Sequence, residues 1–218
     1  MTPVTTTTNT KTVFQKTPFR VMKTRTFIVL ATLLLIEGVM IGQVRPAAAQ
    51  TGAAEDCTKI SDESQRTACW LKKAKAGEKY LRNSWLNGVV LDKVDLNKAD
   101  MSGARLVKAN LTEANLSGAD LREAHLFQAM MYGVNLAGAD LRKTDLIGTD
   151  LRRAKLRGAN LTEAKLTVAD LRWADLEKAN LTGADLYKAD LRGANLTGAN
   201  LTGAKLTGIK KDKDTKGL

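Results

Sequence analysis

The 218-residue chain carries 34 basic and 23 acidic side chains, a formal net charge of +11, and few aromatic residues. The charge is uneven, because the first 49 residues hold six Lys or Arg and a single Glu, whereas residues 86–206 hold 17 basic and 15 acidic side chains. A region this close to neutral lacks the electrostatic field that nucleic-acid binding requires, so nucleic acid is not predicted as a partner.

Residues 1–49 are predicted to be a targeting leader. A short basic segment precedes an apolar run over residues 27–36, and the small residues Ala47 and Ala49 stand three and one positions before Gln50. This order is typical of a secretory signal peptide that is cleaved before Gln50. We therefore expect an exported protein, in a periplasm or a thylakoid lumen.

A retained membrane anchor is the alternative interpretation of the leader, and membrane contact is expected only in that case. The apolar stretch over residues 27–42 contains Glu37 and is shorter than the roughly 20 residues that cross a bilayer, which favours cleavage. Two interpretations of residues 1–21 remain open. Either translation begins at Met22, or these Thr-rich, basic residues form a transit segment before the signal.

Residues 50–85 are predicted to form a helical cap at the N-terminal end of the following repeats. Two short helices are expected around residues 53–60 and 63–76. Cys57 and Cys69 are the only cysteines of the chain, and an even pair in an exported protein predicts a disulfide. A redox role is the alternative, but the spacing lacks a Cys-x-x-Cys motif.

The rest of the chain is dominated by a period of five residues. Every fifth residue from Leu81 to Leu206 is Leu or Met, including 24 consecutive centres from Leu91. Two residues before each of these centres stands a small residue, Ala in 19 units, Val in three and Thr in two. Since five matches neither a helix turn nor a strand, the chain must bend in every unit, and only stacked coils can bury all the centres.

These units resemble the pentapeptide-repeat family, as in Ala199-Asn200-Leu201-Thr202-Gly203. The resemblance implies an all-β solenoid, a right-handed quadrilateral β-helix with four units, or 20 residues, in each coil. About six coils are then expected over residues 86–208, with the short N-terminal α-helical cap before them and a charged tail over residues 209–218. The centre and the small residue should point inward, and the other three positions outward.

Residues 20 apart should stack in rows, and each outward row is a possible place for chemistry. Arg152, Arg172 and Arg192 form one row, with Asp two residues before each, which favours a salt-bridged surface over an anion site. A second row of Asp and Asn offers too few oxygens for a hard cation, so no metal is predicted. No catalytic residues or cofactor are predicted either, because the interior is filled by Leu and Ala.

One departure from the repeat formula predicts a protein-binding surface. Large apolar residues occupy outward positions that are elsewhere polar, and several of them recur at 20-residue steps. A contiguous apolar stripe favours a partner surface, whereas scattered exposed apolar residues are ordinary. The interaction candidates are Val107, Phe127, Met130, Tyr132, Ile147, Val168 and Tyr187.

The sequence thus predicts a non-catalytic exported interaction or scaffold protein that presents a rigid surface to a protein partner of unknown identity. The family resemblance adds a DNA-mimic protein that binds gyrase as one alternative, and a binder of anionic polymers or lipid headgroups is another. Self-association is expected at the edge of the C-terminal coil, where backbone groups lack partners.

Overall fold

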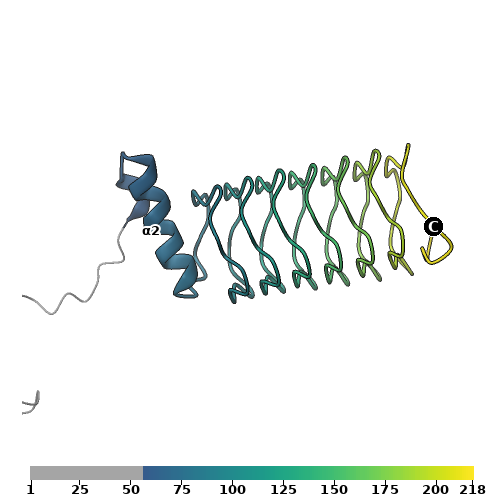
Figure 1. The fold of residues 1–218 in the computed structure, drawn as a ribbon, viewed down its shortest axis with the longest axis horizontal. Helices are drawn as coiled ribbons and strands as arrows, with labels where there is room; N and C mark the ends of the chain where they lie inside the picture. The colour runs from purple at the N-terminus through teal and green to yellow at the C-terminus, as the bar shows by residue number, and fades with distance from the viewer. Residues whose placement is uncertain (1–55) are drawn as a thin grey trace, which may run out of the picture. The chain divides into compact units, whose positions relative to one another are not determined.

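The computed structural model describes residues 56–218, and the predicted leader and cleavage site at Ala47, Ala49 and Gln50 lie outside them. The described chain begins with a 3₁₀ turn, η1 (Cys57–Lys59), and one α-helix, α2 (Glu63–Lys75). A regular stack of coils follows (Figure 1). The described residues contain no extended strands, and the β-structure consists of isolated parallel bridges between coils.

The cap has one α-helix instead of two. The Asp62 side chain accepts the Gln65 N–H at 2.8 Å and begins α2, and Gly77, with a φ of 74°, follows its end. Because this N-cap comes so soon after Asp56, which caps η1, the first predicted helix is reduced to a single turn. The predicted disulfide is confirmed, since Cys57 and Cys69 are bonded with their Cα atoms 5.7 Å apart.

The coils are joined by backbone hydrogen bonds at every unit. From Tyr80 to Asp190, parallel bridges pair each residue that precedes a centre with the residue 20 positions later. Leu141 donates to the Asn160 carbonyl of the next coil at 2.7 Å, and Asp140 donates to Ala119 of the preceding coil at 2.9 Å. Each coil therefore satisfies polar backbone groups of both its neighbours.

Four units complete one coil, which gives the solenoid four faces. The first face contains every fourth unit counted from Leu81, and the second, third and fourth faces are counted in the same way from Leu86, Leu91 and Leu96. The second and fourth faces are opposite each other. A residue's face therefore follows directly from its number.

The predicted inside and outside positions are confirmed. The Leu and Met centres are fully buried from Leu81 to Leu196, and most of the Ala residues two positions before them are buried as well. Two Thr residues replace Ala in this core, and each hydroxyl is satisfied: Thr144 donates to the Leu121 carbonyl at 2.7 Å, and Thr149 to the Leu146 carbonyl at 2.7 Å. The core is one continuous Leu column lined by small residues.

The charged tail remains attached to the last coil. Lys216 donates its backbone N–H to the Ala194 carbonyl at 2.9 Å, and Thr215 Oγ1 donates to the Leu191 carbonyl at 3.0 Å. Asp212 Oδ1 accepts the Gly193 N–H at 3.0 Å. These bonds cover part of the coil edge at which self-association was expected, and the ladder of bridges runs on past residue 208 to Lys216.

Candidate interaction surface

The second face departs most from the repeat formula. On the other faces the residue before the centre is mostly Asp or Asn, whose oxygen accepts a backbone N–H two residues later, as Asn160 does from Thr162 at 3.1 Å. Such bonds support the turn. On the second face the position is filled by a mixed set that we call the central row: Trp85, Arg105, His125, Asp145, Lys165, Asp185 and Lys205.

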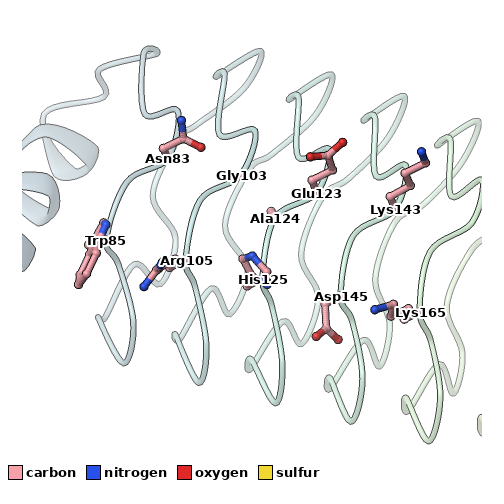
Figure 2. Close-up of a pocket in the computed structure, with 10 residues that line it drawn as sticks. All are labelled: Asn83, Trp85, Gly103, Arg105, Glu123, Ala124, His125, Lys143, Asp145 and Lys165. Atoms are coloured by element: carbon pink, nitrogen blue, oxygen red, sulfur yellow. The ribbon is translucent and has the colours of Figure 1, made fainter. Parts of the chain in front are cut away.

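An open depression of about 530 Å³ follows this row. Figure 2 shows the residues that line it in two rows, which run along successive coils. One of them comprises the first five residues of the central row. The other, which we call the turn row, lies at the corner between the first and second faces and includes Asn83, Gly103, Glu123 and Lys143.

The charges in the middle of the central row are not paired within the chain. Among residues 56–218, no ion pair involves Arg105, Asp145 or Lys165. Further along the row, Lys205 does approach Asp185, at 3.8 Å. The middle of the second face therefore presents charges of both signs that remain open to an external partner.

The N-terminal end of the central row is tied to the cap. The guanidinium of Arg66 on α2 lies 4.3 Å from the centroid of the Trp85 ring, and that of Arg105 lies 4.4 Å from it. Arg66 also donates to the carbonyls of Ile60 and Ser61, at 2.7 and 2.9 Å. Cation–π contacts of this kind fix the ring and the helix together. Sequence reasoning missed this group, although a Trp where Asp or Asn is usual was a visible signal.

An apolar edge borders the central row at the corner between the second and third faces. It contains Val107, Phe127 and Ile147, which are half-buried, and Tyr187, which is 40% exposed. Val107 lines a depression together with central-row residues, so the edge adjoins the charges directly. Val168, the next residue around the corner, is 50% exposed. Five of the seven predicted interaction residues therefore lie on one side of the second face.

The other two predicted interaction residues lie on the third face. Met130 is 49% exposed at the position before a centre, and Tyr132 occupies the following turn. The guanidinium of Arg152 lies 5.7 Å from the centroid of the Tyr132 ring. The structure thus places this pair beyond the corner that carries Phe127.

The arginine ladder of the third face is paired throughout with its acidic neighbours. Arg152 approaches Asp150 at 2.7 Å, and its Nε lies 3.7 Å from Asp170 in the next coil. Hydrogen bonds from Arg152 are the largest cause that lowers the pKa of the Asp150 carboxyl below its usual value. Arg172 and Arg192 repeat the arrangement, each 2.6 Å from its own aspartate. These guanidinium groups are already engaged, which leaves little for an anionic ligand.

Two serine hydroxyls of the repeats have structural contacts within their turns. Ser102 donates to Asp100 at 2.7 Å, and Ser117 donates to Asn115 at 2.9 Å. His125 is exposed in the central row. Within residues 56–218 no group of three or more His, Cys, Asp or Glu side chains is arranged to hold a metal ion. The same residues include no helix long and apolar enough to span a bilayer.

Comparison with solved structures finds similar proteins in photosynthetic organisms. Rfr23, a pentapeptide repeat protein from the cyanobacterium Cyanothece, is 39% identical over 48% of this chain and 61% of that chain, with a TM-score of 0.25. HetL from Nostoc, involved in heterocyst differentiation regulation, is 28% identical over 68% of this chain and 97% of its own, with a TM-score of 0.26.

A pentapeptide repeat protein of the Arabidopsis thaliana thylakoid lumen is 25% identical over 64% of this chain and 73% of its own, with a TM-score of 0.17. A comparison with curated proteins finds no match. The family model for pentapeptide repeats matches eight copies over residues 80–112, 104–142, 135–172 and 169–208. Because these segments cover more than half of the sequence and coincide with the stacked coils, the chain belongs to the pentapeptide-repeat family.

Proposed function

We propose that this protein acts without catalysis, as an exported interaction protein that docks a protein partner on its second face. The observation that carries the proposal is the coincidence of two features on that face. The middle of the central row holds charges without ion pairs in the described chain, and the apolar edge runs beside them. Large apolar side chains supply most binding energy in interfaces, and complementary charges set orientation and partner choice.

We also propose that the leader directs export of the protein. The order of basic, apolar and small residues before Gln50 supports it, and a disulfide is typical of proteins that fold in an oxidising compartment. N-terminal sequencing of the protein from its native host should begin at Gln50. Recovery of an intact chain that retains residues 27–42 in the membrane would contradict the proposal.

The apolar edge gives the direct test of docking. We expect the double substitution Phe127→Ser and Ile147→Thr to reduce crosslinking of the native partner about ten-fold, because two interface anchors are lost. The melting temperature should fall only slightly, since both side chains lie outside the Leu core. Val90→Ser removes a 51% exposed apolar residue from the third face and is the matched control. Equal crosslinking by all three proteins would rule out the second face.

Binding of anionic polymers or lipid headgroups through the arginine ladder is a less favoured function. Each guanidinium of the third-face ladder is already bonded to an aspartate at 2.6 or 2.7 Å, and an anion would have to displace that carboxylate. Retention on a column of immobilised heparin at about 0.15 M salt would support this alternative.

A further inference from the structure

The charges of the second face are complementary to those of a second copy that faces it with its solenoid axis antiparallel. Asp145 and Lys165 are neighbours in the central row, one coil apart. From this we infer that the partner docked on the second face is a second copy of this chain, placed antiparallel and face to face. The inference rests on the proposed function of this face. The two-fold axis would pass between the coils that carry Asp145 and Lys165.

The pairing follows from the geometry of a stack of coils. Successive residues of a row lie about 4.8 Å apart, so reversing one copy about a point between Asp145 and Lys165 brings each residue opposite the other. Asp145 of each copy then faces Lys165 of the second copy, which makes two opposite-charge pairs from one symmetric contact. One coil further out, His125 of each copy faces Asp185 of the second copy, and at the end of the row Arg105 faces Lys205.

The rows on both sides of the central row are complementary about the same axis. In the turn row, Lys143 would face Glu163 of the second copy; within one chain these two exposed side chains lie 3.9 Å apart. On the apolar edge, Phe127 would face Tyr187 of the second copy, and Ile147 would lie opposite Thr167. Three independent rows therefore agree on one register, and the apolar contacts flank the charged ones.

Other arrangements of two copies lack this agreement. A parallel face-to-face pair would set Asp145 against Asp145 and Lys165 against Lys165 of the second copy. An antiparallel pair shifted by one coil also sets like charges in contact, which costs stability in an interface. A shift by two coils toward Lys205 again brings opposite charges together, but it leaves Phe127 without any described residue opposite it. The register about Asp145 and Lys165 is the one that pairs these two opposite charges and also gives Phe127 a residue of the apolar edge as its neighbour, and its one like-charge contact, Arg105 with Lys205, lies at its outer end.

Intrachain ion pairs do not account for the charges of Asp145 and Lys165, although Asp145 accepts the Ile147 N–H at 3.1 Å. On the first and third faces, five arginines each form an ion pair with the Asp two residues earlier: Arg122, Arg142, Arg152, Arg172 and Arg192. These pairs within the chain explain why those charges are present. Asp145 and Lys165 have no ion pair in the described residues, and Lys165 is exposed. Across the proposed interface each finds an opposite charge.

Charge reversal provides the test, with the mature full-length protein measured by sedimentation velocity from about 1 to about 500 µM, a range that covers weak to moderate dimers. The natural protein should dimerise. Asp145→Lys should weaken self-association at least about ten-fold, because two lysines then meet, and Lys165→Asp should do the same, because two aspartates meet. Melting curves should stay close to that of the natural protein, since neither residue is ion-paired within the chain, although Asp145→Lys loses the 3.1 Å bond from the Ile147 N–H.

Mixing the two variants gives the sharpest prediction. In a mixed pair the lysine introduced at position 145 faces the aspartate introduced at position 165, and the natural Lys165 faces the natural Asp145. An equimolar mixture should therefore form a heterodimer about as strong as the natural dimer, although each variant alone self-associates only weakly. Lys155→Asp makes the same change at the same position of a unit on the opposite, fourth face and should leave the dimer intact.

Several outcomes would overturn the inference. A natural protein that remains monomeric to about 500 µM would do so, as would a dimer that is insensitive to both reversals, or single variants that fail to associate when mixed. If the protein is monomeric but the Phe127 and Ile147 substitutions still abolish crosslinking to another protein, the proposed docking function stands and only the identity of the partner is wrong. If neither self-association nor that crosslinking depends on the second face, both proposals fail.

Discussion

At the scale of single residues, the turn in each unit is the conformational cost of this fold. The second residue after every centre has a positive φ, and in 14 units that residue is not glycine. Val168 is the only β-branched residue among them, with a φ of 53°, in a region that Cβ branching disfavours. Strain of this kind costs about 1–2 kcal/mol. An exposed Val that retains this strain fits a place on a docking surface better than a place in the core.

We therefore expect Val168→Gly to raise the free energy of unfolding by about 0.5–1 kcal/mol, since relief of strain exceeds the entropy lost by glycine on folding. The reverse change, Gly158→Val, should lower it by a similar amount. Gly158 has a φ of 63°, and the place that a Cβ would take has no neighbouring atom within 4 Å, so the change tests strain without crowding. Chemical denaturation of both variants checks the prediction. A loss of stability in Val168→Gly would mean that Val168 packs more than its exposure indicates.

The sequence predicted the burial of a side chain well where its position in the repeat unit has a single physical role. Leu141 and its counterparts had to be inside because a period of five leaves no other way to bury them, and they are. The central row could not be predicted, because its meaning depends on which charges are left unpaired. Whether Lys165 reaches Asp185 is decided by side-chain geometry that no spacing rule contains. The contact of Trp85 with Arg66 likewise depends on how α2 lies against the first coil.

At the scale of elements, the paired ladders predict how the solenoid responds to acid. Hydrogen bonds from the adjacent arginines lower the pKa of Asp120, Asp140, Asp150 and Asp190. The unfolded chain has carboxyls of ordinary pKa, near 3.9, and so binds more protons than the folded chain as pH falls toward that value. The ladders therefore contribute stability that is present in full above the unfolded pKa and is lost as pH falls through the folded pKa.

We expect the melting temperature to change little between about pH 5 and 8 and to fall below about pH 4. Asp150→Asn should lower the melting temperature at neutral pH and shrink the difference between neutral and acid conditions, because one titrating pair is removed. Thermal melts followed by circular dichroism across this range make the measurement. A melting temperature that stays constant to pH 2 would show that the ladder pairs add nothing to stability.

The cap and the tail show where element prediction succeeds and fails. The sequence predicted a helix around residues 63–76, and α2 occupies nearly that range, between the Asp62 cap and Gly77. The tail has no repeat formula, yet two side chains hold it on the last coil. Asp212 accepts the Gly193 N–H that a further coil would otherwise satisfy, and Thr215 donates to the Leu191 carbonyl. Such bonds replace part of a missing unit, and a charged composition alone does not reveal them.

At the scale of the whole molecule, repetition makes a uniform scaffold, and function must reside in departures from it. Three faces keep an Asp or Asn that supports most of their turns, so the outward polar groups of those faces are largely used by the fold. The second face gives up this support in several coils and carries unpaired charges beside an apolar edge. A solenoid tolerates that exchange because the stacked backbone ladder and the Leu column stabilise each coil independently of its surface.

The charge density of the whole repeat region also argues against mimicry of DNA. The expected six coils, at about 4.8 Å each, span about 29 Å, and a DNA duplex of that length carries about 17 negative charges. Residues 86–206 carry 15 acidic and 17 basic side chains, and many of these are paired with one another. We therefore expect the mature protein at micromolar concentration neither to inhibit DNA supercoiling by gyrase nor to protect gyrase from a quinolone. A supercoiling assay with and without the drug makes the measurement, and protection in that assay would show that the surface engages gyrase by something other than duplex-like charge.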